Sequence, residues 1–169
     1  YQDFEVVIVD DGSTDNSVDV VESIHDSRIR LIHQKNGGPG KARTTGVKNA
    51  YGEWIVMLDA DDELLPNGLE TFQKIIDIAS NIDIVDCNTL YYNSSGNTEG
   101  YHPINGYVKN PMKKFFYSAI GPGSNHSCFK KRLLENFPYN TQMRRFEDAD
   151  LLMRLLPKAK IYSSSKPVA

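Results

Sequence analysis

The sequence predicts an α/β fold with an open, mostly parallel sheet flanked by helices, followed by a mixed half of helices and strands. Two observations support this fold class. Runs of β-branched residues such as Val6–Val9 are typical of strands buried on both faces of a parallel sheet. Segments with apolar residues at helical spacing alternate with these runs along the first half of the chain, which is the pattern of βαβ units.

The first half contains four predicted strands separated by three predicted helices. The strands are expected at Val6–Val9, Ile29–His33, Trp54–Leu58 and Ile82–Cys87. The helices are expected around Val18–Ile24, over Lys41–Ala50 and over Pro66–Ala79. Each of these helical segments places apolar or small residues on one side, so that this side can pack on a sheet.

Turn and capping residues mark the boundaries of these elements. Gly12 permits a tight turn after the first strand, and the polar residues 13–15 can cap the helix that follows. Residues 36–40 contain three glycines and a proline, so they predict a loop. Pro66 is suited to the first turn of a helix, where its missing N–H costs no hydrogen bond.

Beyond about residue 90 the pattern changes. We expect a hairpin turn at 93–97, a short helix at 110–117, a loop at 121–123, a strand at 127–129, a helical turn at 131–136 and a helix at 147–156. The chain shows no internal repeat and no linker composition. We therefore expect one domain over residues 1–169, with 1–90 and 91–169 as two unlike halves.

Composition excludes several classes of function. The chain has 19 Lys and Arg against 22 Asp and Glu, which gives a net charge of −3. This balance provides no basic surface for nucleic acid or for an anionic membrane. Two cysteines are too few for a disulfide framework or a four-cysteine zinc site. No apolar run approaches the ~20 residues that span a bilayer.

Paired acids follow two of the predicted strands. Asp10 and Asp11 end the first, and Asp59 and Asp61 follow the third. Ligands of open parallel sheets bind beyond the carboxyl ends of the strands. On an extended segment Asp59 and Asp61 point the same way, and Mg²⁺ favours one or two carboxylates together with phosphate oxygens. The pattern favours a metal-bridged diphosphate over simple helix capping.

Two further motifs are ambiguous when each is taken alone. The glycine-rich segment 36–40 with Lys41 and Arg43 fits either an anion cradle or a flexible connector, and it does not match the P-loop pattern. Glu147 and Asp148 open a predicted helix, where acids commonly only complement the helix dipole. Their spacing by itself does not decide between catalysis and helix stabilisation.

The combination of motifs is far more specific than its parts. In order they are residues 4–15 (FEVVIVDDGSTD), 36–43 (NGGPGKAR), Gly46, 52–62 (GEWIVMLDADD) and 146–148 (FED). This set strongly resembles the family-2 glycosyltransferases, which have the GT-A fold. The resemblance is dense over residues 4–65 and loose between about 90 and 140. It implies that 1–90 is the nucleotide-binding half and that 91–169 is the acceptor-side half.

The resemblance assigns roles to single positions. It implies that the nucleotide-binding residues are Asp10, Asp11, Gly12, Arg43 and Asp59. It implies a divalent metal, Mn²⁺ or Mg²⁺, at Asp59 and Asp61. It implies that the catalytic residues are Asp148, as general base, and its neighbour Glu147. A carboxylate at this place would accept the proton of the acceptor hydroxyl as its oxygen attacks.

The implied activity is an inverting, metal-dependent transfer of a sugar from a nucleotide-diphosphate sugar, and the expected donor is a UDP-sugar. The acceptor would be a saccharide or a lipid-linked saccharide, as in polysaccharide or cell-surface glycan synthesis, and no nucleic acid is involved. The family places a further strand ahead of residue 1, so we expect a fragment of a longer chain. A cytoplasmic protein is expected, with peripheral association to the inner face of the membrane left open.

Two alternatives compete with this interpretation. A phospho-receiver signalling domain also has an acid pair, a later acceptor aspartate and a Lys-Pro, which Asp10, Asp11, Asp59 and Lys166-Pro167 imitate. Lys166, however, lies 166 − 59 = 107 residues beyond Asp59, too far for a domain of ~120 residues. The second alternative is a catalytically silent module that binds a nucleotide sugar without turnover.

Overall fold

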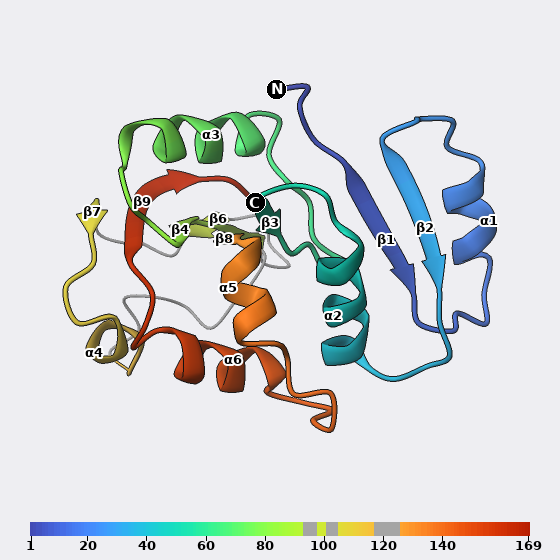
Figure 1. Cartoon of the computed structure of the whole chain (residues 1–169). Coiled ribbons are helices and arrows are strands. Elements are labelled where there is room, and N and C mark those ends of the chain that lie inside the picture. The colour runs from blue at the N-terminus through green and yellow to red at the C-terminus, as the bar shows by residue number, and fades with distance from the viewer. Residues whose placement is uncertain (93–97, 101–104, 117–125) are drawn as a thin grey trace.

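The computed structural model describes residues 1–92, 98–100, 105–116 and 126–169 (Figure 1). The expected hairpin turn at 93–97 and the expected loop at 121–123 lie outside the described residues. The chain forms an α/β fold in which helices flank two main sheets. No helix of the described ranges is long and apolar enough to cross a membrane.

The first sheet is a parallel pair of strands. β1 (Val6–Asp10) pairs with β2 (Ile29–His33), and Asp10 lies opposite His33 at the carboxyl end. The short helix α1 (Ser17–Glu22) connects the two strands and has no buried residue. β1 is only half-buried rather than covered on both faces, and Val6 is 37% exposed. No described strand pairs with its second edge.

The second sheet has five strands in the order β3-β8-β4-β9-β7. These strands are β3 (Trp54–Val56), β8 (Ser127–Lys130), β4 (Ile84–Asn88), β9 (Ile161–Pro167) and β7 (Gly106–Tyr107). Only β4 and β9 run parallel, while β8 is antiparallel to both β3 and β4. The α/β class is confirmed, and this sheet is mixed because a strand from the second half inserts between two strands of the first.

The helices cover both faces of the five-stranded sheet. Figure 1 shows α3 (Gly68–Ile78) on one side, and α5 (Lys131–Asn136) and α6 (Glu147–Leu155) on the other. α2 (Pro39–Asn49) lies between the two sheets and packs on β1. The remaining elements are α4 (Pro111–Phe116) and the antiparallel pair β5 (Leu90–Tyr92) and β6 (Thr98–Gly100).

Side-chain alternation along the strands divides the core in two. Ile84, Phe129 and Ile161 point to the side of α5 and α6, where they pack with the leucines of those helices. Val85 and Cys128 point to the opposite side and pack with the apolar face of α3. Both cysteines of the chain, Cys87 and Cys128, are buried and free, and they pack in the core as small hydrophobic residues.

The seven-residue strand β9 was not expected from the sequence. Its run Ile161–Pro167 contains three consecutive serines, which favour loops when read by composition. The structure buries Ser163 and Ser164 at 0% and 5% exposure beside β4. The strand cannot be predicted from local sequence, because a polar residue is acceptable inside a sheet only when a specific partner satisfies it, and that partner is distant in sequence.

The partner is a carboxyl group in the centre of the sheet. Asp86 on β4 is fully buried and lies opposite Ser127 of β8 and Ser163 of β9. The hydroxyl groups of Ser127 and Ser163 donate to its two oxygens at 3.0 and 3.3 Å. Nε2 of His126 lies 3.5 Å from Oδ1 of Asp86. Asp86 therefore joins three neighbouring strands through side chains as well as through the backbone ladder.

Burial sets the protonation of this cluster. It raises the pKa of Asp86 to about 7, an effect that the hydrogen bonds from Ser127 and Ser163 only partly offset. Burial also lowers the pKa of His126 to about 4. The unfolded chain deprotonates Asp86 near pH 4, so between about pH 4 and pH 7 the folded state holds a proton that the unfolded state has lost. The contribution of Asp86 to stability is complete below pH 4 and is lost as the pH rises through 7.

Asp86→Asn tests this pH dependence. The free energy of unfolding of wild type minus that of the variant should fall between pH 4 and pH 7, by up to about 1.4 kcal/mol per pH unit. Chemical denaturation at a series of pH values measures the difference. Asp77→Asn, an exposed acid on α3, is the control and should show a flat difference. A flat difference for Asp86→Asn would contradict a neutral buried carboxyl.

Candidate functional site at the carboxyl ends of the strands

Charged residues from both halves of the chain meet at one place. β1 ends in Asp10, Asp59 follows β3, and Arg43 lies in the first turns of α2. Glu147 is the first residue of α6, more than a hundred positions from Arg43. Ion pairs link Asp59, Arg43 and Glu147 directly. The motifs that carry Asp59, Arg43 and Glu147 therefore converge in space.

The turn after β1 requires glycine. Gly12 has a φ of +86°, and a Cβ placed there would lie 3.3 Å from the backbone N of Asn36. Glycine is favoured by both the left-handed backbone and the close approach of the second loop. Oδ1 of Asp10 accepts the backbone N–H of Ser13 across this turn, and its Oδ2 lies 3.1 Å from Nδ1 of His33. Hydrogen bonds from Ser13 and His33 lower the pKa of Asp10 to about 2.

Asp11 organises the glycine-rich loop. Its carboxylate accepts the backbone N–H groups of Gly37 and Gly38 at 2.7–3.1 Å and the side-chain amide of Gln34 at 2.5 Å. Burial would raise the pKa of Asp11, but these hydrogen bonds outweigh it and the pKa is lowered. Of the two alternatives left open for segment 36–40, an anion cradle is not available at the N–H groups of Gly37 and Gly38, because a protein carboxylate occupies them.

Arg43 bridges two carboxylates. Its Nη2 donates to Oδ1 of Asp59 at 2.7 Å and its Nη1 to Oε1 of Glu147 at 2.5 Å. The side chains of Arg43 and Glu147 are 16% and 8% exposed, whereas that of Asp59 is 44% exposed. The two carboxylates outweigh the cost of burying the guanidinium and raise the pKa of Arg43 above its usual range. The bridge thus has one buried carboxylate and one that solvent can reach.

Asp59 and Asp61 lie in a turn and not on an extended segment. β3 ends at Val56, and the N–H of Asp62 donates to the carbonyl of Asp59 at 3.1 Å. The expectation that Asp59 and Asp61 point the same way because they lie two apart on an extended segment is therefore wrong. Both carboxylates nevertheless lie near the end of β3. Asp61 is exposed. Within the described residues no group of three or more His, Cys, Asp or Glu is arranged to hold a metal ion by itself.

Asp148 lies in the first turn of α6, directly after the buried Glu147. Its Oδ1 accepts the N–H of Ala149 at 2.7 Å, and its side chain is partly exposed. The residue before the helix, Phe146, has a left-handed backbone with φ 60° and ψ 21°. That conformation turns the chain sharply into α6, so that Glu147 is directed inward while Asp148 keeps contact with solvent.

Tyr139 is a site residue that sequence analysis did not identify. Its ring lies under the guanidinium of Arg43, with 5.7 Å from Cζ to the ring centroid. Tyr139 is 4% exposed, and its hydroxyl makes no hydrogen bond to any described residue. Burial raises its pKa well above the usual range, with the Asp148, Asp59 and Glu147 carboxylates adding to the shift. The only sequence signal was a tyrosine after a proline, which carries no chemical pattern.

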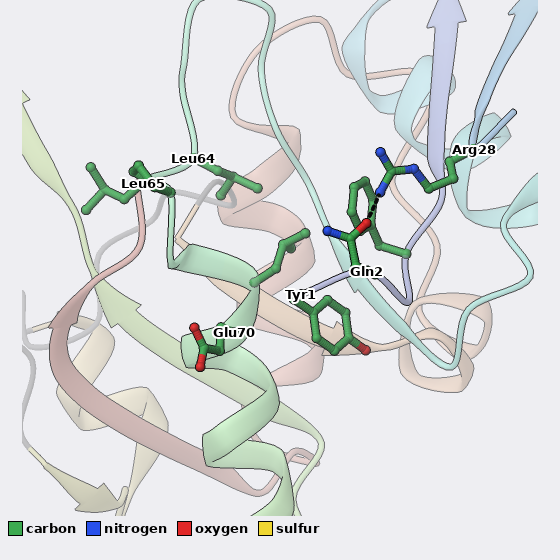
Figure 2. Close-up of a pocket in the computed structure, with 9 residues that line it drawn as sticks. Tyr1, Gln2, Arg28, Leu64, Leu65 and Glu70 are labelled. Carbon is green, nitrogen blue, oxygen red and sulfur yellow. Dashed lines mark hydrogen bonds between the residues drawn. The ribbon is translucent and has the colours of Figure 1, made fainter. Parts of the chain in front are cut away.

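A separate pocket lies at the opposite end of the first sheet. Figure 2 shows this pocket, of about 280 Å³, between the N-terminal segment, Arg28 and residues 64–70. Arg28 precedes β2 and donates to Oε1 of Gln2 at 3.2 Å. β1 and β2 are parallel, so this end lies opposite to the one that carries Asp10 and His33. The pocket is therefore not part of the acidic site.

The chain was compared with known proteins. The model of the family described as "Glycosyl transferase family 2" matches residues 1–147. The succinoglycan biosynthesis protein ExoO of Rhizobium meliloti is 34% identical over 154 residues, which cover 86% of this chain and 43% of ExoO. The chain spans less than half the length of curated relatives that it matches.

Two solved structures are similar in fold. TarS 1–349 of S. aureus in complex with UDP-GlcNAc has a TM-score of 0.82 at 24% identity, covering 98% of this chain and 48% of that one. The mannosyltransferase PcManGT from Pyrobaculum calidifontis, in complex with GDP-Man and Mn²⁺, has a TM-score of 0.63 at 23% identity, covering 96% and 45%.

The family match extends over the acidic strand ends, Arg43 and Glu147, and the fold agrees with it. The expected family is confirmed, and it replaces the receiver domain as the explanation of the paired acids. The chain belongs to glycosyl transferase family 2.

Proposed function

We propose that this chain transfers a sugar from a nucleotide-diphosphate donor, a UDP-sugar, to a saccharide or lipid-linked saccharide acceptor with inversion. The observation that carries the proposal is the convergence of Asp59, Arg43 and Glu147–Asp148 from the two halves of the chain. The solved complexes of TarS with UDP-GlcNAc and of PcManGT with GDP-Man support a nucleotide-sugar donor. ExoO, by its name, supports a role in polysaccharide synthesis.

The donor is proposed to bind along the ends of β1 and β3. Asp10, Asp11 and Gly12 form the rim on the β1 side, and Asp59 with Arg43 forms the rim on the β3 side. Asp11 acts mainly by fixing the loop 36–38, since its oxygens already accept three groups of the protein. Arg43, which pairs with Asp59, is the cation proposed to face the diphosphate. This arrangement matches acidic groups with the nucleoside and a basic group with phosphate.

The donor set fits a divalent metal that is shared with a diphosphate. Asp59 and Asp61 offer two carboxylates on one turn, which is the number that Mg²⁺ or Mn²⁺ uses when phosphate oxygens complete its coordination. Too few protein ligands lie together to hold such an ion alone, so metal and nucleotide are expected to bind together. When bound, the ion would neutralise negative charge that develops on the leaving diphosphate. The Mn²⁺ in the PcManGT complex supports this assignment.

Asp148 is proposed as the general base. Its Oδ1 accepts the N–H of Ala149, and Oδ2, which has no hydrogen bond to a described residue, is the oxygen proposed to accept the proton. The acceptor hydroxyl oxygen forms a bond to the anomeric carbon as the bond from that carbon to the diphosphate oxygen breaks. The electron pair leaves with the diphosphate, and the hydroxyl proton moves to Asp148. A single displacement of this kind inverts the anomeric centre.

We further propose a cytoplasmic location, at the inner face of the membrane if the acceptor is lipid-linked. Cys87 and Cys128 are both free thiols in the structure, which is compatible with a reducing compartment. The mild net charge of −3 gives no support for direct adsorption to an anionic lipid surface. Any membrane association would therefore depend on the acceptor or on further chain.

Calorimetry of UDP binding by the full-length protein tests the donor and the metal together. UDP should bind in the presence of Mn²⁺, and removal of the metal with a chelator should weaken binding by about 10-fold or more, because the diphosphate then loses its bridging cation. Asp61→Asn should reproduce the weakened binding in the presence of Mn²⁺. Glu63→Gln, a charge change two residues away, is the matched control. Metal-independent UDP binding in wild type would overturn the metal assignment, and absence of UDP binding would overturn the donor.

Asp148→Asn tests the base. The amide cannot accept the proton, so turnover should fall by about 10²-fold or more, while UDP affinity with Mn²⁺ should stay within about 2-fold. Donor turnover in the presence of a saccharide acceptor measures the first quantity, and calorimetry measures the second. Retained turnover would remove Asp148 as the base. Donor binding by wild type without any turnover would instead favour the catalytically silent binding module.

A further inference from the structure

Glu147 does not have the surroundings of a residue that reacts with substrate. The whole residue is 6% exposed, and its Oε1 accepts the N–H of Arg43 Nη1 at 2.5 Å. A buried carboxylate is stable only when a cation or several hydrogen bonds compensate for lost water. The guanidinium of Arg43 supplies this compensation. Glu147 is thus already engaged within the protein, in contrast to the partly exposed Asp148 next to it.

Gly40 allows α2 and α6 to pack closely where Arg43 meets Glu147. A Cβ at Gly40 would lie 3.5 Å from Cγ of Glu147 and 3.3 Å from the carbonyl oxygen of Asn140. A glycine at this position lets the first turn of α2 approach α6 closely. The helices α2 and α6 are in contact. The close approach brings the side chain of Arg43, one turn further along α2, to the start of α6.

Arg43 links Glu147 to Asp59, so that the position of Glu147 affects where Nη2 of Arg43 meets Asp59. A guanidinium is planar and rigid, so fixing one terminal nitrogen and one face determines where the other terminal nitrogen points. Glu147 fixes Nη1, and the ring of Tyr139 lies 5.7 Å from Cζ. The remaining Nη2 meets Oδ1 of Asp59 at 2.7 Å. Asp59 has the most exposed side chain of the three residues that form the bridge, and it is the one that a ligand can reach.

We propose that Glu147 is a positioning residue that acts through Arg43 to set the orientation of Asp59 for the metal–nucleotide. This inference rests on the proposed function, because it needs Asp59 to engage the donor. Arg43 divides its charge between two carboxylates, so neither holds it exclusively. Without Glu147 the guanidinium pairs with Asp59 alone, and Asp59 becomes less available to a cation. The first half of the Glu-Asp pair thereby serves the donor, and the second half serves the acceptor.

Glu147→Gln is the primary test in the full-length protein. Glutamine keeps the shape and one acceptor oxygen but removes the charge, so the UDP dissociation constant in the presence of Mn²⁺ should rise about 10-fold, with a change of less than about 2-fold in its absence. Asp150→Asn is the matched control: it removes one carboxylate from the same helix, where it pairs with Arg154. It should leave both constants unchanged.

A double-mutant cycle with Arg43→Lys separates positioning from loss of stability. Lysine keeps the charge but cannot reach two carboxylates with a rigid fork, so the single variants and the double variant should all weaken Mn²⁺-dependent UDP binding to a similar extent. Additive losses, or an equal loss with and without Mn²⁺, would show a purely structural role and overturn the inference. Unchanged affinity in Glu147→Gln, with normal UDP binding by wild type, would overturn this inference alone. Absence of UDP binding by wild type would overturn the proposed function and this inference with it.

Discussion

The guanidinium of Arg43 is the contact on which the candidate site depends. Its two carboxylate partners come from the turn after β3 and from the start of α6, which belong to different halves of the chain. A single buried charge between two opposite charges is favourable only while all three groups are in place, since loss of either partner leaves a poorly compensated ion. The bridge therefore constrains the relative placement of the donor-side turn and the helix that carries Asp148.

The scaffold beneath this bridge is held together by a second buried polar group. Asp86 lies in the centre of the five-stranded sheet and accepts hydrogen bonds from the serines of both neighbouring strands. These strands, β8 and β9, come from the second half of the chain, whereas β4 comes from the first. The two halves of the chain are thus joined at two places: by Asp86 inside the five-stranded sheet, and by Arg43 at the candidate site. A buried polar group of this kind specifies its partners more strictly than apolar contacts do.

Much of this architecture could be predicted from the sequence because it is locally encoded. The strand and turn around Gly12 follow from a β-branched run and a glycine, and α5 and α6 begin at the expected residues, Lys131 and Glu147. β9 could not be predicted, because the burial of its serines depends on Asp86, which is 77 residues from Ser163. Tyr139 was missed for the same reason, since only the approach of Arg43 distinguishes it from an ordinary core tyrosine.

The sequence motifs also could not divide the acids by role, and the structure can. Both oxygens of Asp10 and of Asp11 are engaged by protein groups, among them the N–H groups of Ser13, Gly37 and Gly38. Glu147 is buried, and its Oε1 pairs with Arg43. Asp61 is exposed, and the partly exposed Asp148 has one oxygen hydrogen-bonded within the part of the chain that the structure describes. A carboxylate that already accepts strong hydrogen bonds gains little by exchanging them for a ligand, whereas one in contact with water can bind a cation or accept a proton. The same acidic pattern therefore contains two groups of residues. One group builds the rim of the site, and the other is left for the chemistry.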